Sequence, residues 1–143
     1  MEIRRDTYLN KLISKRHNSL IKVVTGVRRC GKSYLLFELF REHLRNDHVP
    51  DDHIIEMAFD AYENKKYQNA DVFFPYLTER LNDQDQYYVL LDEVQLLGDF
   101  ESILNSLARR KNVDVYVTGS NAKFLSKDII TEFRGRGDGL MEA

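Results

Sequence analysis

Eight consecutive residues, Gly26 to Ser33, follow the pattern G-x-x-x-x-G-K-[ST], which is typical of loops that wrap a chain of phosphates. In such a loop several backbone N–H groups point inward, and glycines at positions such as Gly26 and Gly31 leave the backbone unhindered. We expect Lys32 to reach the terminal phosphates and the Ser33 hydroxyl to bind Mg²⁺. The predicted phosphate-binding set is Gly26, Val27, Arg28, Arg29, Cys30, Gly31, Lys32, Ser33 and Tyr34, with no side-chain role given to the two arginines.

A pair of acids, Asp92 and Glu93, directly follows the apolar run Tyr87 to Leu91. This has the form of a Walker B element, in which a buried strand delivers two carboxylates at its carboxyl end. We predict that Asp92 holds Mg²⁺ and that Glu93 polarises the attacking water. Two acids after a strand also occur in solvated turns; the upstream phosphate loop favours the functional interpretation.

Two further polar groups could contribute to the same chemistry. Ser120 and Asn121 follow the run Val113 to Thr118, where they could orient water or sense the γ-phosphate. Both residue types are also preferred helix N-caps, so the two interpretations stay open. Arg134 and Arg136 lie among glycines, and either an arginine finger, for which Arg136 is the candidate, or a solvated basic loop fits them.

The elements that must position these residues alternate along the chain. The patterns predict strands over 20–25, 53–59, 87–91 and 113–118, and helices over 4–17, 33–45, 70–81, 100–109 and 122–133. Residues 60–69 are expected to form a loop. The third strand is apolar on both faces, which indicates an α/β fold whose mostly parallel sheet is covered by helices. Because ligands of such sheets bind outside the carboxyl ends of the strands, we expect Asp92 beside the phosphate loop.

Composition places the chain among ordinary globular domains. It has 143 residues, 43% of them hydrophobic and 31% charged, which suits one domain with one core. It lacks an 18-residue apolar run, a secretory signal pattern and, with the single Cys30, a disulfide framework, so we expect a cytoplasmic protein without membrane contact. The net charge of −2 makes no case for nucleic-acid binding.

Four segments together resemble the N-terminal ATPase domain of the AAA+-like prokaryotic ATPases: IKVVTGVRRCGKSYLL, YYVLLDEVQLLGDFESILNSL, VDVYVTGSNAKFLS and TEFRGRG. The resemblance implies a three-layer AAA+-type core that binds ATP and Mg²⁺. It places Gly26, Gly31, Lys32 and Ser33 in Walker A and Asp92 and Glu93 in Walker B. Ser120 or Asn121 would be sensor 1, and Arg134 and Arg136 fall in the family's Arg-Gly-Arg segment. A nuclease-like domain usually follows in the family, so nucleic-acid binding is implied by analogy alone.

The chain departs from this family at its end. The family continues into another strand and a lid, whereas residues 137–143 have no strand pattern. We therefore expect a single, incomplete, truncated domain over 1–143, without the last strand and the lid and with a disordered tail at 138–143. The sheet edge left open would favour self-association.

Three functions fit these residues. The first is ATP binding with Mg²⁺-dependent hydrolysis. The second is a nucleotide-binding switch or oligomerisation module with little hydrolysis, because the lid and later arginine contacts are missing. The third is a small-molecule kinase, for which no segment clearly supplies an acceptor site.

Overall fold

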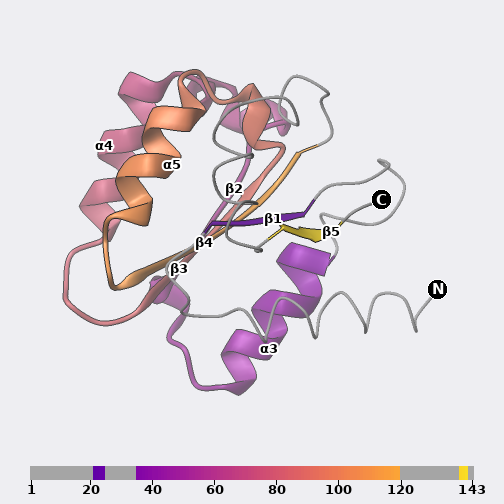
Figure 1. Ribbon diagram of the computed structural model, residues 1–143, viewed down its shortest axis with the longest axis vertical. Helices are drawn as coiled ribbons and strands as arrows, with labels where there is room; N and C mark the ends of the chain where they lie inside the picture. Colours follow the sequence, from indigo (N-terminus) through magenta and orange to yellow (C-terminus); the bar gives the residue numbers. More distant parts are fainter. Residues whose placement is uncertain (1–20, 25–34, 120–138, 142–143) are drawn as a thin grey trace.

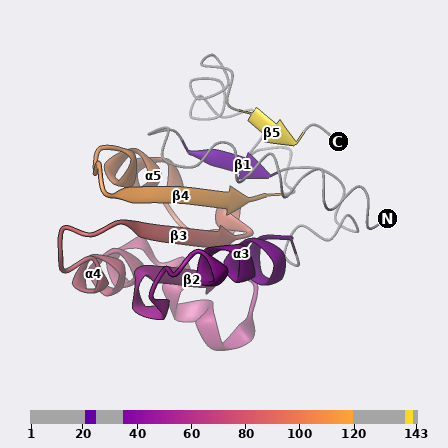
Figure 2. The ribbon, with the colours of Figure 1, turned by 90° about the horizontal axis from the view of Figure 1, so that it is seen from below.

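The computed structural model describes residues 21–24, 35–119 and 139–141, and its centre is a parallel sheet. The strands are β1 (Lys22–Val24), β2 (Ile54–Ala58), β3 (Tyr87–Asp92), β4 (Val113–Thr118) and β5 (Gly139–Met141). They lie side by side in the order β2-β3-β4-β1-β5, and every neighbouring pair is parallel. Figure 2 shows the arrowheads of β1, β3, β4 and β5 pointing the same way. The predicted α/β fold with a mostly parallel sheet is therefore confirmed.

Helices cover both faces of this sheet (Figure 1). Helices α4 (Ala70–Arg80) and α5 (Phe100–Ala108) lie on one face. On the other face, π-helical turns over Leu35–Phe40 continue into α3 (Arg41–Asn46). The helices predicted over 33–45, 70–81 and 100–109 are thus confirmed for the residues that the structure describes.

The burial of β3 explains why its sequence is apolar on both faces. All six residues of the strand are buried. Val89 and Leu91 belong to the larger hydrophobic cluster, together with α4 and α5 residues such as Phe73 and Leu107. Tyr88 and Leu90 belong to a second cluster, whose other buried members are Phe40, Leu44 and Tyr116. Alternate side chains of one strand therefore pack against opposite helical layers, as a parallel sheet covered on both sides requires.

The segment between β2 and α4 is more ordered than its sequence predicted. Residues 60–69 were expected to form a loop, but Tyr62–Gln68 forms turns of 3-10 helix. Asn69 then caps α4, because its side chain accepts a hydrogen bond from the backbone N–H of Asp71 at 2.8 Å. The helices predicted over 4–17 and 122–133 lie outside the described residues.

The expected absence of a last strand is wrong. Gly139–Met141, placed by the sequence in a disordered tail, pairs in parallel with β1 as β5, with a shift of register between Val23 and Val24. A strand of three residues shows no readable alternation, and its pairing uses backbone groups of a strand more than a hundred residues earlier. The edge of β1 that we expected to be open is therefore occupied by β5, and β2 and β5 are the edge strands of the sheet.

Within the described part of the chain, no helix combines the length and the apolar character that a membrane crossing needs.

Candidate functional site

Three strand ends meet at the carboxyl edge of the sheet. In β1 the last residue, Val24, pairs with Thr118 at the end of β4. In β3, Leu91 pairs with Val117, so Asp92 lies at the same level as Thr118. The chain enters the predicted phosphate loop directly after Val24 and Thr25. The end of β1, after which the predicted loop begins in the sequence, and the acid pair consequently lie at one edge of the sheet, as a phosphate site between them requires.

Asp92 is held from both neighbouring strands. Its carboxylate oxygen Oδ1 accepts a hydrogen bond from the Thr118 hydroxyl at 2.6 Å, and the two residues are 3% and 0% exposed. Its backbone carbonyl accepts a hydrogen bond from the N–H of Phe59, just after β2, at 3.1 Å. A buried carboxylate keeps its charge only where it is hydrogen-bonded or paired. The fold thus presents Asp92 as a fixed acid at the end of its strand.

Glu93 turns the chain sharply out of β3. Its backbone is left-handed, with φ of 55° and ψ of 53°, a conformation that is strained for a glutamate and that clusters at functional sites. The backbone N–H of Glu93 donates to the Thr118 hydroxyl oxygen at 2.9 Å. Its carboxylate oxygen Oε1 accepts a hydrogen bond from Nε2 of Gln95 at 2.7 Å. One hydroxyl therefore organises both acids, and Glu93 is held through its backbone and its side chain.

Of the predicted site residues, the structure describes the acid pair and brings its two members to the expected edge. The loop residues Gly26 to Tyr34, the candidate sensors Ser120 and Asn121, and the arginines Arg134 and Arg136 lie outside the described residues.

Among the residues that the structure describes, sequence reasoning missed Thr118 and Gln95, whose side chains contact the acids. A signal existed for Thr118, because a polar residue that ends the strand next to an acid-bearing strand can reach that acid. Gln95 offered a weaker signal, since it lies two positions after Glu93 in the short turn Val94–Leu96.

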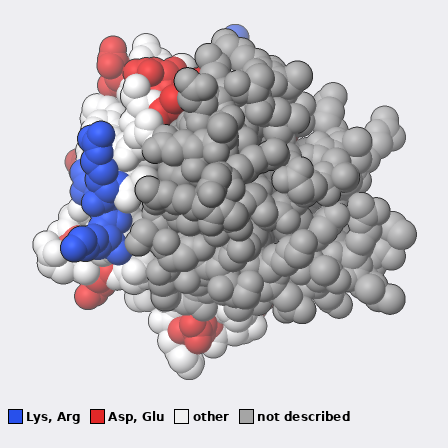
Figure 3. Space-filling model, in the orientation of Figure 1, with Lys and Arg blue, Asp and Glu red and all other residues white. Residues whose placement is uncertain are grey.

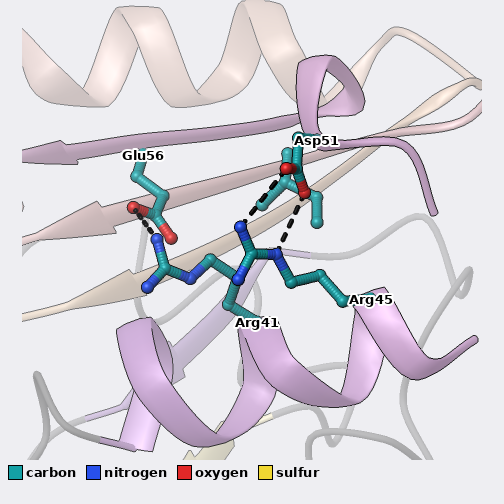
Figure 4. Close-up of a pocket in the computed structure, with 5 residues that line it drawn as sticks. Arg41, Arg45, Asp51 and Glu56 are labelled. Atoms are coloured by element: carbon teal, nitrogen blue, oxygen red, sulfur yellow. Dashed lines mark hydrogen bonds and ion pairs between the residues drawn. The ribbon is translucent and has the colours of Figure 1, made fainter. Parts of the chain in front are cut away.

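A shallow groove of about 260 Å³ lies elsewhere, between α3 and the edge strand β2 (Figure 4). Arg41 donates to Glu56 Oε1 at 3.1 Å, while Arg45 donates to both carboxylate oxygens of Asp51 at 3.0 and 3.2 Å. Burial raises the pKa of the Glu56 carboxyl above its ordinary value, and Arg41 partly opposes this. Each arginine is therefore paired with a neighbouring acid. The Arg41–Glu56 ion pair connects α3 to β2, and these paired arginines add no free positive charge to the carboxyl edge of the sheet.

At the opposite, amino edge of the sheet, His53 lies between two carboxylates. Its ring nitrogen Nδ1 is 2.7 Å from Asp52 Oδ1, and Nε2 is 3.0 Å from Asp83 Oδ2. The ring also stacks on Tyr87, with centroids 4.2 Å apart. Both ring nitrogens are engaged in these contacts, so we assign the histidine a structural role.

Basic side chains gather on the side of the molecule where α4 and α5 lie (Figure 3). Four exposed basic residues lie at the ends of these two helices or directly after them, namely Arg80, Arg109, Arg110 and Lys111. Because β3 and β4 begin shortly afterwards, these residues lie towards the amino edge of the sheet. They are therefore separated from the acid pair by the length of the strands.

The chain matches known proteins over most of its length. A family model described as an AAA domain matches residues 18–141. An uncharacterised protein of Haemophilus influenzae is 35% identical over 135 residues, which cover 94% of this chain and 34% of that protein. The uncharacterised protein MJ1544 of Methanocaldococcus jannaschii is 30% identical over 120 residues, covering 81% of this chain and 24% of that protein. The chain thus spans about a third or less of the length of these relatives.

The fold has a counterpart among solved structures. The structure of C. elegans PCH-2 superposes with a TM-score of 0.57 at 20% sequence identity, covering 91% of this chain and 40% of that one. At this identity the likeness concerns the fold alone. The family match, the parallel sheet with helices on both faces and the acid pair at its carboxyl edge agree, and the chain belongs to the AAA domain family of nucleotide-binding, ATPase-type domains.

Proposed function

We propose that this chain binds ATP with Mg²⁺ at the carboxyl edge of its sheet and hydrolyses the bound ATP. The observation that carries the proposal is the position of Asp92, the last residue of β3, and of Glu93 directly after it. They lie level with the end of β1, after which the predicted phosphate loop begins in the sequence. In this proposal the backbone of residues 26–34 binds the phosphates and Lys32 contacts the terminal ones.

The acids suit a magnesium ion chemically. Mg²⁺ is a hard cation that prefers carboxylate and hydroxyl oxygens and keeps several waters. Asp92 and Ser33 would hold it, and Thr118 would fix the Asp92 carboxylate through the 2.6 Å hydrogen bond. When bound, the ion neutralises charge on the phosphate oxygens.

Glu93 would act on the water that attacks the γ-phosphate. A carboxylate within hydrogen-bond reach of a water orients it and accepts its proton as the bond to phosphorus forms. The left-handed backbone turns Glu93 away from the direction of the strand, and the contact with Gln95 holds its carboxylate oxygen Oε1. Ser120 or Asn121 as γ-phosphate sensor and Arg136 as arginine finger complete the proposal from the sequence.

The test compares the parent chain with Lys32→Ala and Glu93→Gln. Lys32→Ala should weaken ATP binding measured by calorimetry, because a cation beside the phosphates is lost. Glu93→Gln should bind ATP like the parent and release phosphate about a hundredfold or more slowly, since an amide cannot accept the proton. Equal phosphate release by Glu93→Gln and the parent would exclude Glu93 as the base.

The same measurements separate the alternative functions. ATP·Mg²⁺ binding by the parent without phosphate release would favour a nucleotide-binding switch. Phosphate transfer to a small-molecule acceptor, in place of release to water, would favour a kinase. Self-association stays a prediction. Nucleic-acid binding also stays a prediction, and it rests on the family resemblance alone.

A further inference from the structure

The turn that follows the acid pair places an amide against Glu93. Nε2 of Gln95 donates a hydrogen bond to Glu93 Oε1 at 2.7 Å. Hydrogen bonds to an ionised carboxylate are shorter and stronger than neutral ones, and this length fits a charged acceptor. We propose that Gln95 is the positioning residue for Glu93: its hydrogen bond fixes the orientation in which the Glu93 carboxylate acts on the attacking water. This inference rests on the proposed hydrolysis and assigns a residue to it.

Gln95 can fix Glu93 because its own turn is anchored. The neighbours Val94 and Leu97 are 0% and 1% exposed in the larger hydrophobic cluster. The backbone N–H of Leu96 donates to the carbonyl of Glu93 at 3.1 Å, and that of Gly98 donates to the carbonyl of Gln68 at 2.8 Å. A side chain on a packed turn holds its partner more closely than one on a free loop. The contact therefore links the Glu93 carboxylate to the hydrophobic core.

The carbonyl oxygen of the Gln95 side chain indicates that this glutamine contributes little to the stability of the fold. Oε1 of Gln95 is buried and has no hydrogen-bond partner among the described residues. A buried acceptor without a partner costs about as much as a hydrogen bond to a charged group contributes, so the two effects largely cancel. Rotating the amide would direct its oxygen at the carboxylate, where two acceptors repel each other. The charge of Glu93 thus dictates the orientation, and the orphaned oxygen is its consequence.

The experiment uses Gln95→Met, which keeps the length of the side chain and removes both the donor and the orphaned acceptor. A matched control is Gln86→Met, because Gln86 stands at the other end of β3 and also makes one side-chain hydrogen bond, to the carbonyl of Tyr87 at 3.0 Å. Gln95→Glu is the second variant, since it replaces the donor with an acceptor of like charge. Phosphate release, binding of a non-hydrolysable ATP analogue and the urea midpoint of unfolding are measured for each.

We expect Gln95→Met to lower kcat by about tenfold to a hundredfold, because a misplaced base loses its near-attack geometry. KM and the affinity for the analogue should stay within about twofold of the parent, and the urea midpoint should not fall below that of Gln86→Met. Gln95→Glu should lower kcat further at a similar affinity. A kcat equal to that of the parent in both Gln95 variants would overturn the inference and leave the proposed hydrolysis standing.

Two further outcomes also decide the question. If kcat falls only in proportion to analogue affinity or to the fraction folded, or if neither Gln95 variant folds, Gln95 has a structural role and the inference is wrong. If the parent itself binds ATP·Mg²⁺ and releases no phosphate, the proposed hydrolysis fails and the inference fails with it.

Discussion

At the scale of single residues, the Thr118 hydroxyl is the central contact of the acid pair. It donates to Asp92 Oδ1 at 2.6 Å and accepts from the backbone N–H of Glu93 at 2.9 Å. Donor and acceptor capacities of the hydroxyl are therefore both used, and each partner lies at the end of β3. Among side chains of this size, only the hydroxyls of serine and threonine supply a strong donor and a strong acceptor from one atom.

We predict that Thr118→Val destabilises the protein by about 1 to 3 kcal/mol, because valine keeps the shape and leaves a buried carboxylate oxygen and an N–H without this partner. Urea unfolding followed by circular dichroism measures the change, and ATP turnover should fall in the same variant. Thr118→Ser should retain most of both properties.

Thr78→Val provides the control, since the Thr78 hydroxyl donates at 3.0 Å to a carbonyl of its own helix, that of Phe74. A loss in Thr118→Val no larger than in this control would show that the contact with the acids contributes little.

At the scale of elements, the short strand β1 is joined to β4 by a buried ion pair. The Lys22 ammonium contacts Asp114 Oδ1, with the side chains 0% and 2% exposed. The Tyr116 hydroxyl donates to Asp114 Oδ2 at 2.8 Å, and the ammonium lies 5.1 Å from the centre of the Tyr116 ring. Lys22 and Tyr116 are also register partners. The pair therefore favours the register that brings Val24, the last residue of β1, level with Thr118.

We predict that Lys22→Met destabilises the protein by about 3 to 5 kcal/mol, because it leaves the buried Asp114 carboxylate without its cation. Adding Asp114→Leu should recover much of this loss, since two apolar side chains remove the buried charge altogether. Chemical unfolding of both single variants and the double variant measures the coupling.

The exposed pair of Arg45 and Asp51 is the comparison. Its side chains are 45% and 73% exposed, so Arg45→Ala should cost no more than about 1 kcal/mol. If Lys22→Met lowered the free energy of unfolding by no more than about 1 kcal/mol, this would contradict the conclusion that the buried ion pair holds β1 in register with β4.

At the scale of the whole molecule, His53 makes stability depend on pH. Burial lowers the pKa of its imidazole, but hydrogen bonds and charges from Asp52 and Asp83 raise it more, and the net shift is upward from 6.5. The pKa of Asp83 is lowered by the backbone N–H of Asp85 and by His53. A raised histidine pKa means that the folded state binds the proton more tightly than the unfolded state does.

The stability that His53 contributes is therefore fully present below its ordinary pKa of 6.5 and is lost as the pH rises through the raised value. We predict that the difference in unfolding free energy between the parent and His53→Gln shrinks over that interval. Urea unfolding at a series of pH values, compared with the exposed-site control His48→Asn, measures it. A difference that grows with pH would reverse the sign and contradict the charged state of His53.

Much of the fold, namely its strands, its helices and the parallel order of its sheet, was predictable because the sequence patterns that indicate these elements are local. The apolar run Tyr87 to Leu91 predicts a buried strand, and the two acids that follow it predict a polar strand end. Alternation of strands and helices predicts a parallel sheet, and parallel order places the carboxyl ends of β1, β3 and β4 at one edge. Each of these inferences needs only neighbouring residues in the chain.

The contacts within the site depend on residues far apart in the sequence. Thr118 meets Asp92 across 26 positions and Lys22 meets Asp114 across 92, and no periodicity reveals either pair. The strand β5 likewise exists because β1 offers it an unpaired edge, although Gly139–Met141 has no strand pattern of its own.

By itself, then, the sequence determined the kind of fold, the motif and the acids that could serve it. Tertiary structure alone decided which hydroxyl and which amide hold those acids, and that a final strand closes the edge of the sheet. The physical reason is that hydrogen-bond partners and strand neighbours are chosen by the order of strands in space, and distant segments acquire that order only when they pack together.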